Sequence, residues 1–204
     1  PRSTAGAPSS VTAASGIDAL THCIEAYTNV HAHPAVNLYA LEGIRLIGAH
    51  VTRAVRDGTD LQARSAMSLG SLYGGLCLGP VNTAAVHALA YPLGGTFKVP
   101  HGVANSMLLP FVMEYNLPSA GHRYADIAEA LGTTAHAEAA VDRVRELTRS
   151  CSIPSSIAEF GVTESDLDSM AEAAVQVTRL MANNPRTVGV ADAREIYRRA
   201  LEGV

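Results

Sequence analysis

Apolar residues recur at helical spacing along almost the whole chain. In the stretch "HPAVNLYALEGIRLIGAHVTRAVRDG", residues 33–58, five apolar residues fall on one helical face: Val36, Ala40, Ile44, Ile47 and Val51. Pro34 suits the first turn of this helix, and Gly58 suits its end. No segment alternates apolar and polar residues for long enough to indicate a strand. The pattern therefore predicts an all-α fold of about eight or nine helices around one core.

Further helices are predicted over residues 60–79, 101–116, 119–132, 135–151, 163–181 and 190–202. The helix over 60–79 begins at Asp60, a favourable capping residue, and is apolar on nearly all sides, which indicates a buried helix. "PLGGTFKVP", residues 92–100, is interpreted as a loop, and its Gly94–Gly95 pair is explained by a tight turn or by close helix packing. Pro118 and "CSIPSS" are candidate breaks between two halves, but not domain boundaries.

Composition narrows the class of protein. Apolar residues make up 48% of the 204 residues and charged residues only 17%, which favours a large buried core. The three cysteines form no CxxC pair or disulfide framework and are expected to be buried free thiols. A net charge of −4 without a basic patch argues against nucleic acid as a partner. We find no membrane-spanning run and no signal peptide, and expect a cytoplasmic protein.

The polar residues that break the apolar pattern suggest a metal site. In "GIDALTH", Asp18 and His22 stand one turn apart and share a helix face. His87 and His101 frame an apolar, glycine-rich segment with few polar groups to satisfy an imidazole. One carboxylate and three imidazoles suit a divalent first-row metal. Spacing alone leaves two other interpretations open, an ordinary polar pair on the first helix and satisfied core histidines in the later segment.

Three longer motifs resemble a known family. "ASGIDALTHCIEAY", "VHALAYPLGGTFKVPHGVANSMLLP" and "NNPRTVGVADAREIYRRALE" are similar to the C-terminal helical domain of the iron-containing alcohol dehydrogenases. That family includes lactaldehyde reductases, butanol dehydrogenases and maleylacetate reductases, and the resemblance covers essentially the whole chain. The chain contains no GxGxxG or P-loop motif. The family's N-terminal α/β nucleotide-binding domain therefore has no counterpart here, and residues 1–204 are expected to form the helical domain alone.

The resemblance implies specific site residues. Family members hold Fe²⁺, with Zn²⁺ as an alternative, by an Asp and a His four residues apart and by two histidines fourteen apart. These positions correspond to Asp18, His22, His87 and His101. His101 is also implied to face the nicotinamide. Many members carry a further histidine near the reacting alcohol, where this chain has Tyr91, so a catalytic role at that position is in doubt and a packing role is open.

The activity implied by the resemblance is NAD(P)-dependent interconversion of a small alcohol and its aldehyde or ketone, in a homo-oligomeric enzyme. Without the nucleotide-binding domain, the chain is expected to fold but to be inactive. Two alternatives remain: a non-catalytic helical metal-binding module, or a metal-dependent hydrolase that uses the same ligands. A hydrolase needs a general base beside the metal, and the sequence contains no HExxH motif.

Overall fold

The computed structural model describes residues 2–203, and over that range it contains helices and loops without strands. The α-helices are α1 (Ser9–Thr28), α2 (Pro34–Arg56), α3 (Leu61–Val81), α4 (Ala85–Phe97), α5 (His101–Ala130), α6 (Ala137–Ser150), α7 (Leu167–Val175), α8 (Thr178–Met181) and α9 (Val190–Glu202). Three short 3-10 helices complete the set: η1 (Arg2–Thr4), η2 (Ile157–Phe160) and η3 (Glu164–Asp166). The predicted all-α fold is confirmed.

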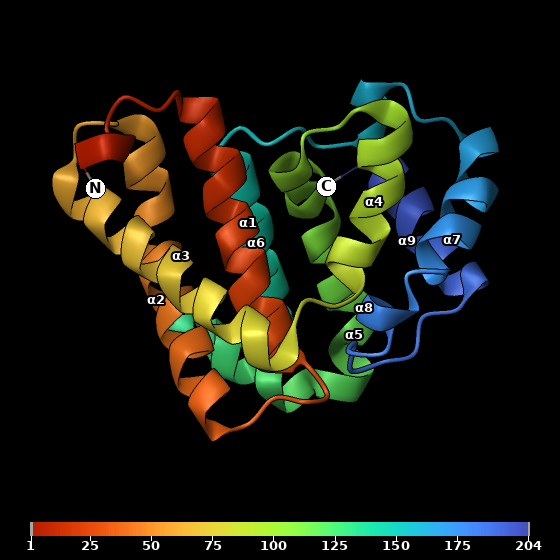
Figure 1. Cartoon of the computed structure of the whole chain (residues 1–204), viewed down its shortest axis with the longest axis horizontal. Coiled ribbons are helices and arrows are strands. Elements are labelled where there is room, and N and C mark those ends of the chain that lie inside the picture. Colours follow the sequence, from red (N-terminus) through yellow and green to blue (C-terminus); the bar gives the residue numbers. More distant parts are fainter. Residues whose placement is uncertain (1, 204) are drawn as a thin grey trace.

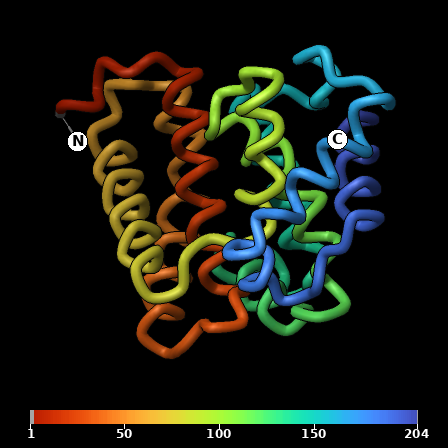
Figure 2. Tube along the Cα trace, turned by 45° about the vertical axis from the view of Figure 1, so that its right-hand side comes forward, coloured from red at the N-terminus to blue at the C-terminus, as the bar shows by residue number. Residues whose placement is uncertain are grey.

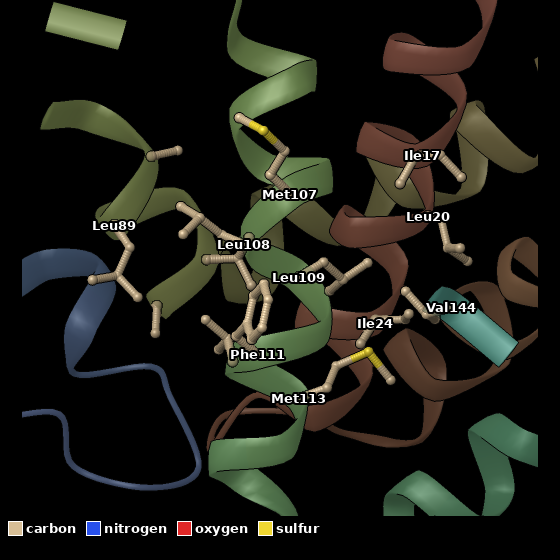
Figure 3. Packing of buried hydrophobic residues seen from close by; sticks show 14 of the residues in the cluster. Ile17, Leu20, Ile24, Leu89, Met107, Leu108, Leu109, Phe111, Met113 and Val144 are labelled. Carbon is tan, nitrogen blue, oxygen red and sulfur yellow. The ribbon is translucent and has the colours of Figure 1, made fainter. Parts of the chain in front are cut away.

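The helices form two groups on either side of α5. Helices α1, α2 and α3 lie side by side in one group, and α4, α7, α8 and α9 make up the other (Figures 1 and 2). Helix α6 packs against α5. The core is continuous between the groups, with Ile24 of α1 beside Leu109 of α5 (Figure 3). Helix α1 is thus enclosed by its neighbours along most of its length.

Several predicted helix boundaries are confirmed. Helix α2 starts at Pro34, as its first-turn position suggested. The Asp60 side chain accepts a hydrogen bond from the Ala63 N–H at 2.9 Å and caps α3. Helix α9 covers Val190–Glu202, the predicted range, directly after Gly189.

The prediction that the helix over 60–79 is buried is wrong. Only one face of α3 packs against α1 and α2, through residues such as Gly70, Gly74 and Cys77. Leu72 is 55% exposed, and three further leucines on the outward side are also exposed: Leu61, Leu69 and Leu76. The single charged residue of α3, Arg64, is buried and donates to the Thr12 hydroxyl. The apolar outward face was mistaken for a core-facing one, because an apolar side chain does not by itself report burial.

The loop predicted over 92–100 is confined to residues 98–100, and the prediction is wrong for residues 92–97. Helix α4 continues through Pro92 and both glycines to Phe97, so Gly94 and Gly95 make no tight turn. Leu89 and Leu93, one turn apart, are both fully buried. Burial of this pair holds the helix together across the proline, whose missing N–H would otherwise favour an end.

Helix α5 joins two helices that the sequence separated. It runs from His101 to Ala130 with non-helical dihedrals at Ala120 (φ −134°, ψ 23°), two residues beyond Pro118. Two helical segments therefore meet at a kink just after Pro118, in agreement with the break predicted there. The single helix predicted over 163–181 is instead divided into η3, α7 and α8.

The three cysteines are buried and free, as predicted. Burial raises the thiol pKa of all three, that of Cys77 to about 11. Low thiolate character makes these side chains packing residues rather than nucleophiles. Among residues 2–203, none of the helices combines the length and apolar character that a membrane span requires.

Candidate metal centre

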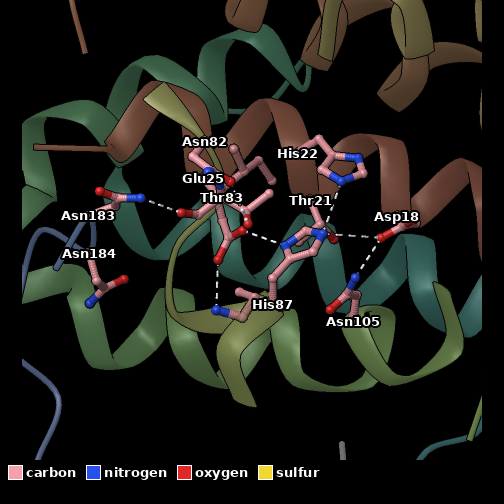
Figure 4. A network of polar contacts seen from close by, with 12 residues as sticks. Asp18, Thr21, His22, Glu25, Asn82, Thr83, His87, Asn105, Asn183 and Asn184 are labelled. Carbon is pink, nitrogen blue, oxygen red and sulfur yellow. Dashed lines mark hydrogen bonds and ion pairs between the residues drawn. The ribbon is translucent and has the colours of Figure 1, made fainter. Parts of the chain in front are cut away.

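A polar stripe runs along the otherwise apolar helix α1. Asp18, His22 and Glu25 follow one another at intervals of four and three residues, so their side chains share one face. The stripe faces the start of α4, where His87 is the third residue (Figure 4). Asp18 and His22 are half-buried, whereas Glu25 and His87 are buried.

The stripe brings three potential ligand groups together. His22 Nε2 and His87 Nε2 are 3.0 Å apart, and their rings stack with centroids 4.6 Å apart. Asp18 Oδ1 lies 3.7 Å from His87 Nε2. One ligand atom from each of Asp18, His22 and His87 lies within 4.8 Å of the other two.

His101, the first residue of α5, adjoins this group. Its Nε2 is 3.8 Å from Asp18 Oδ1, and its ring centroid is 5.3 Å from that of His87. The side chain is 54% exposed, so it marks the open side of the cluster. Asn105, one turn further along α5, places its Nδ2 2.7 Å from Asp18 Oδ1 and 3.0 Å from His101 Nε2.

A close approach of two backbones positions His101. A Cβ on Gly102 would lie 2.7 Å from the carbonyl oxygen of Ala14 and 2.9 Å from its carbonyl carbon. Backbone atoms cannot move aside as the end of a side chain can. Glycine at this position therefore lets the start of α5 pack directly against α1, beside Asp18.

The ionisable groups of the cluster influence one another. Burial, and then the positive charge of His87, lowers the pKa of His22. Burial also opposes the charged form of His87, but the carboxylates of Glu25 and Asp18 outweigh it and raise the His87 pKa. Burial favours the neutral form of Glu25, yet His87 and the N–H groups at the start of α4 lower its pKa.

The donor set fits a divalent metal. Glu25 Oε2 lies 2.6 Å from His87 Nδ1, so a neutral His87 donates from Nδ1 and keeps its Nε2 lone pair towards His22. Two nitrogens bound to a tetrahedral ion at about 2.0–2.1 Å lie roughly 3.3–3.4 Å apart. The two nitrogens of His22 and His87 are 3.0 Å apart, slightly closer than this, and Asp18 Oδ1 is 3.7 Å from His87 Nε2. Two imidazoles and a carboxylate, with a third imidazole beside them, suit Fe²⁺ or Zn²⁺.

Two polar residues beside the cluster, Glu25 and Asn105, were not identified from the sequence. The candidate residue Tyr91 lies apart from the buried core. Glu25 continues the Asp18–His22 stripe by one turn, a spacing that could have identified it. Asn105 lies four residues after His101, but an asparagine at that spacing is not distinctive. Tyr91 is 49% exposed, which gives no support to a packing role within this domain.

The fold and the cluster together define the class of protein: a helical domain in which an acid and several histidines form a site suited to a divalent cation. Its sequence identifies the family: the model of the Fe-containing alcohol dehydrogenase family, C-terminal, matches residues 12–201. The chain belongs to this family of oxidoreductases and corresponds to its C-terminal domain.

Individual relatives agree with this assignment. The chain is 45% identical over its whole length to long-chain-alcohol dehydrogenase 1 of Geobacillus thermodenitrificans, of which it covers 53%. It is 39% identical over 96% of its length to the 1,3-propanediol dehydrogenase of Citrobacter freundii, of which it covers 52%. The chain thus spans about half the length of these relatives.

Solved structures show the same fold. The crystal structure of a 1,3-propanediol oxidoreductase superposes with a TM-score of 0.93 at 39% identity, over 97% of this chain and 53% of that one. An alcohol dehydrogenase from Oenococcus oeni gives a TM-score of 0.90 at 32% identity, over 96% and 53% of the two chains.

Proposed function

We propose that Asp18, His22, His87 and His101 hold a divalent metal, Fe²⁺ or Zn²⁺, in the catalytic centre of an NAD(P)-dependent alcohol dehydrogenase. The observation that supports this most is the convergence of ligand atoms from Asp18, His22 and His87 within 4.8 Å, from helices α1 and α4. His101 adjoins them from α5, with its Nε2 3.8 Å from Asp18.

The chemistry of the site follows from its ligands. A divalent metal bound here supplies a Lewis acid for the substrate oxygen. His22 and His87 fix the inner side of the site, because both are anchored on packed helices. His101 is exposed at its open side, and we propose that it faces the nicotinamide as well as the metal. Tyr91, half-exposed on α4, is a secondary candidate for contact with substrate.

Residues 1–204 form, on this proposal, one helical domain of a larger enzyme. Relatives are about twice as long, and hydride transfer requires the nicotinamide to be held about 3–3.5 Å from the substrate carbon. A small alcohol, aldehyde or ketone is the proposed substrate, and a homo-oligomer the proposed state of the whole enzyme. The chain alone is expected to fold and bind metal but to lack dehydrogenase activity.

The hydrolase alternative needs a general base beside the metal. The nearest additional carboxylate, Glu25, accepts hydrogen bonds from His87 and from the Val86 N–H. With both oxygens engaged and 3% of the residue exposed, Glu25 is not free to activate water.

Metal titration tests the proposal directly. Purified chain is titrated with Zn²⁺, or with Fe²⁺ under anaerobic conditions, and compared with Asp18→Ala, His87→Ala and His101→Ala. We expect one tight site in the parent chain and weaker binding in each variant. Unchanged affinity in all three variants would exclude this ligand set.

Activity separates the enzyme from a non-catalytic module. A longer protein, in which this chain follows a nucleotide-binding domain as the proposal requires, is assayed for NAD(P)-linked oxidation of short alcohols, with the chain alone as comparison. Metal-dependent turnover only in the longer protein is expected. Metal binding without turnover in either, across a panel of alcohols, would favour the module.

A further inference from the structure

Glu25 connects the two helices that supply the candidate ligands. It lies on α1, one turn beyond His22, and is 3% exposed. Its Oε2 is 2.6 Å from His87 Nδ1, and its Oε1 accepts the Val86 N–H at 2.7 Å (Figure 4). A buried carboxylate is thus engaged at both oxygens, by two consecutive residues of α4.

One oxygen completes the start of α4. The first N–H groups of a helix have no partner within the helix, and a side chain usually accepts from the second or third of them. Ala84, at the capping position of α4, has no side chain that can do so. Glu25 accepts from Val86, the second residue of α4, and so provides from α1 the cap that α4 lacks. Its negative charge is also favourable at a helix N-terminus.

The other oxygen selects the tautomer of His87. A carboxylate only accepts, so the neutral imidazole must carry its proton on Nδ1 and present the Nε2 lone pair on the opposite side. That side faces His22 Nε2 at 3.0 Å and Asp18 Oδ1 at 3.7 Å. With the proton on Nε2 instead, His87 could not act as a ligand from that atom, and Nδ1 would present a lone pair to a carboxylate.

We propose that Glu25 is a positioning residue of the metal centre, which sets the tautomer of His87 and fixes the start of α4 against α1. This inference rests on the proposed metal site. Glu25 itself touches neither metal nor substrate. Residues of this kind contribute by orienting ligands, and their loss typically weakens metal binding by about 10–100-fold.

The decisive variant is Glu25→Gln. Glutamine has nearly the same shape, and its Oε1 can still accept from Val86, so the cap on α4 is retained. Its amide then meets His87 Nδ1 as a donor, which reverses that hydrogen bond and forces the proton onto Nε2. Glu42→Gln, which removes a carboxylate from an exposed pair with Arg45 on α2, is the matched control.

Two measurements on the full chain test the proposal. Long-range ¹H–¹⁵N spectra of the metal-free protein, at a pH where His87 is neutral, report the tautomer. We expect the Nδ1–H form in the parent chain and in Glu42→Gln, and the Nε2–H form in Glu25→Gln. Zn²⁺ affinity, measured against a chelating dye, is expected to fall about 10–100-fold in Glu25→Gln and to be unchanged in the control.

The outcomes distinguish this inference from the function on which it rests. An Nε2–H tautomer in the parent chain would overturn the positioning role, and this spectrum needs no variant to fold. Parent-like Zn²⁺ affinity in a folded Glu25→Gln, while Asp18→Ala loses binding, would also overturn it but leave the metal site standing. Zn²⁺ affinity that no ligand variant alters would instead remove the metal site.

Discussion

Helices α1 and α3 are similar in length and apolar character but occupy opposite environments. Helix α1 buries 13 of its 20 residues and presents a polar stripe to the start of α4. Helix α3 buries six of its 21 residues and leaves leucines in contact with solvent. The difference shows that polar residues within an apolar helix can mark its most constrained face, while apolar residues can lie on its least constrained one.

The largest effect is expected from truncation in the core of α1. Ile24 is 1% exposed and packs within the main core. Ile24→Ala should lower the free energy of unfolding by about 2–5 kcal/mol, because it removes buried methyl groups and leaves a cavity. Urea denaturation followed by circular dichroism measures it. A loss below 1 kcal/mol would mean that α1 is less enclosed than the structure indicates.

The next effect concerns the polar stripe. His22→Ala should weaken Zn²⁺ binding by more than about 100-fold, since in the proposed site it removes a ligand and not merely a residue that orients one. Isothermal titration calorimetry measures the affinity. His122→Ala, at an exposed histidine of α5, is the control and should bind as the parent chain does. Equal losses in both variants would contradict a site-specific role for α1.

Metal binding should weaken as the pH falls, because protons compete with the metal for His22 and His87. Burial lowers the pKa of His22, so its neutral form predominates at pH 6.5, whereas the carboxylates of Glu25 and Asp18 raise the pKa of His87, so its protonated form predominates there. Metal must displace the His87 proton. Affinity should therefore still rise above pH 6.5, by up to about tenfold per pH unit until His87 is neutral.

The groups that face His87 in this titration are Asp18, Glu25, His22 and His101. Zn²⁺ affinity measured from pH 5.5 to 8.5, together with proton release in buffers of different ionisation enthalpy, checks the prediction. Affinity that stays constant across this range would exclude the histidines as ligands.

The smallest effect is expected on the outer face of α3. Leu72→Ala removes as large an apolar group as Ile24→Ala does, but from a residue that is 55% exposed. Its free energy of unfolding should change by no more than about 0.5 kcal/mol. The same urea experiment provides the comparison. A loss close to that of Ile24→Ala would show that the face of α3 is covered in solution.

Helical periodicity and motif spacing determined much of this protein from the sequence alone. They predicted the all-α fold, the limits of α2 and α9, and the four candidate ligands Asp18, His22, His87 and His101. These features are local or depend on residue identity at fixed intervals, so they can be recognised without knowledge of the packing.

Tertiary structure decided the remainder. Burial of Leu89 and Leu93 kept α4 helical through Pro92, against the local preference of proline and glycine. The exposure of the outward side of α3 and the contacts of Glu25 depend on which helices pack beside α3 and α1. Glu25 contacts Val86 and His87, which lie 61 and 62 positions further along the chain. Burial and long-range hydrogen bonds arise only when distant segments meet, and one-dimensional periodicity contains no information about which segments those are.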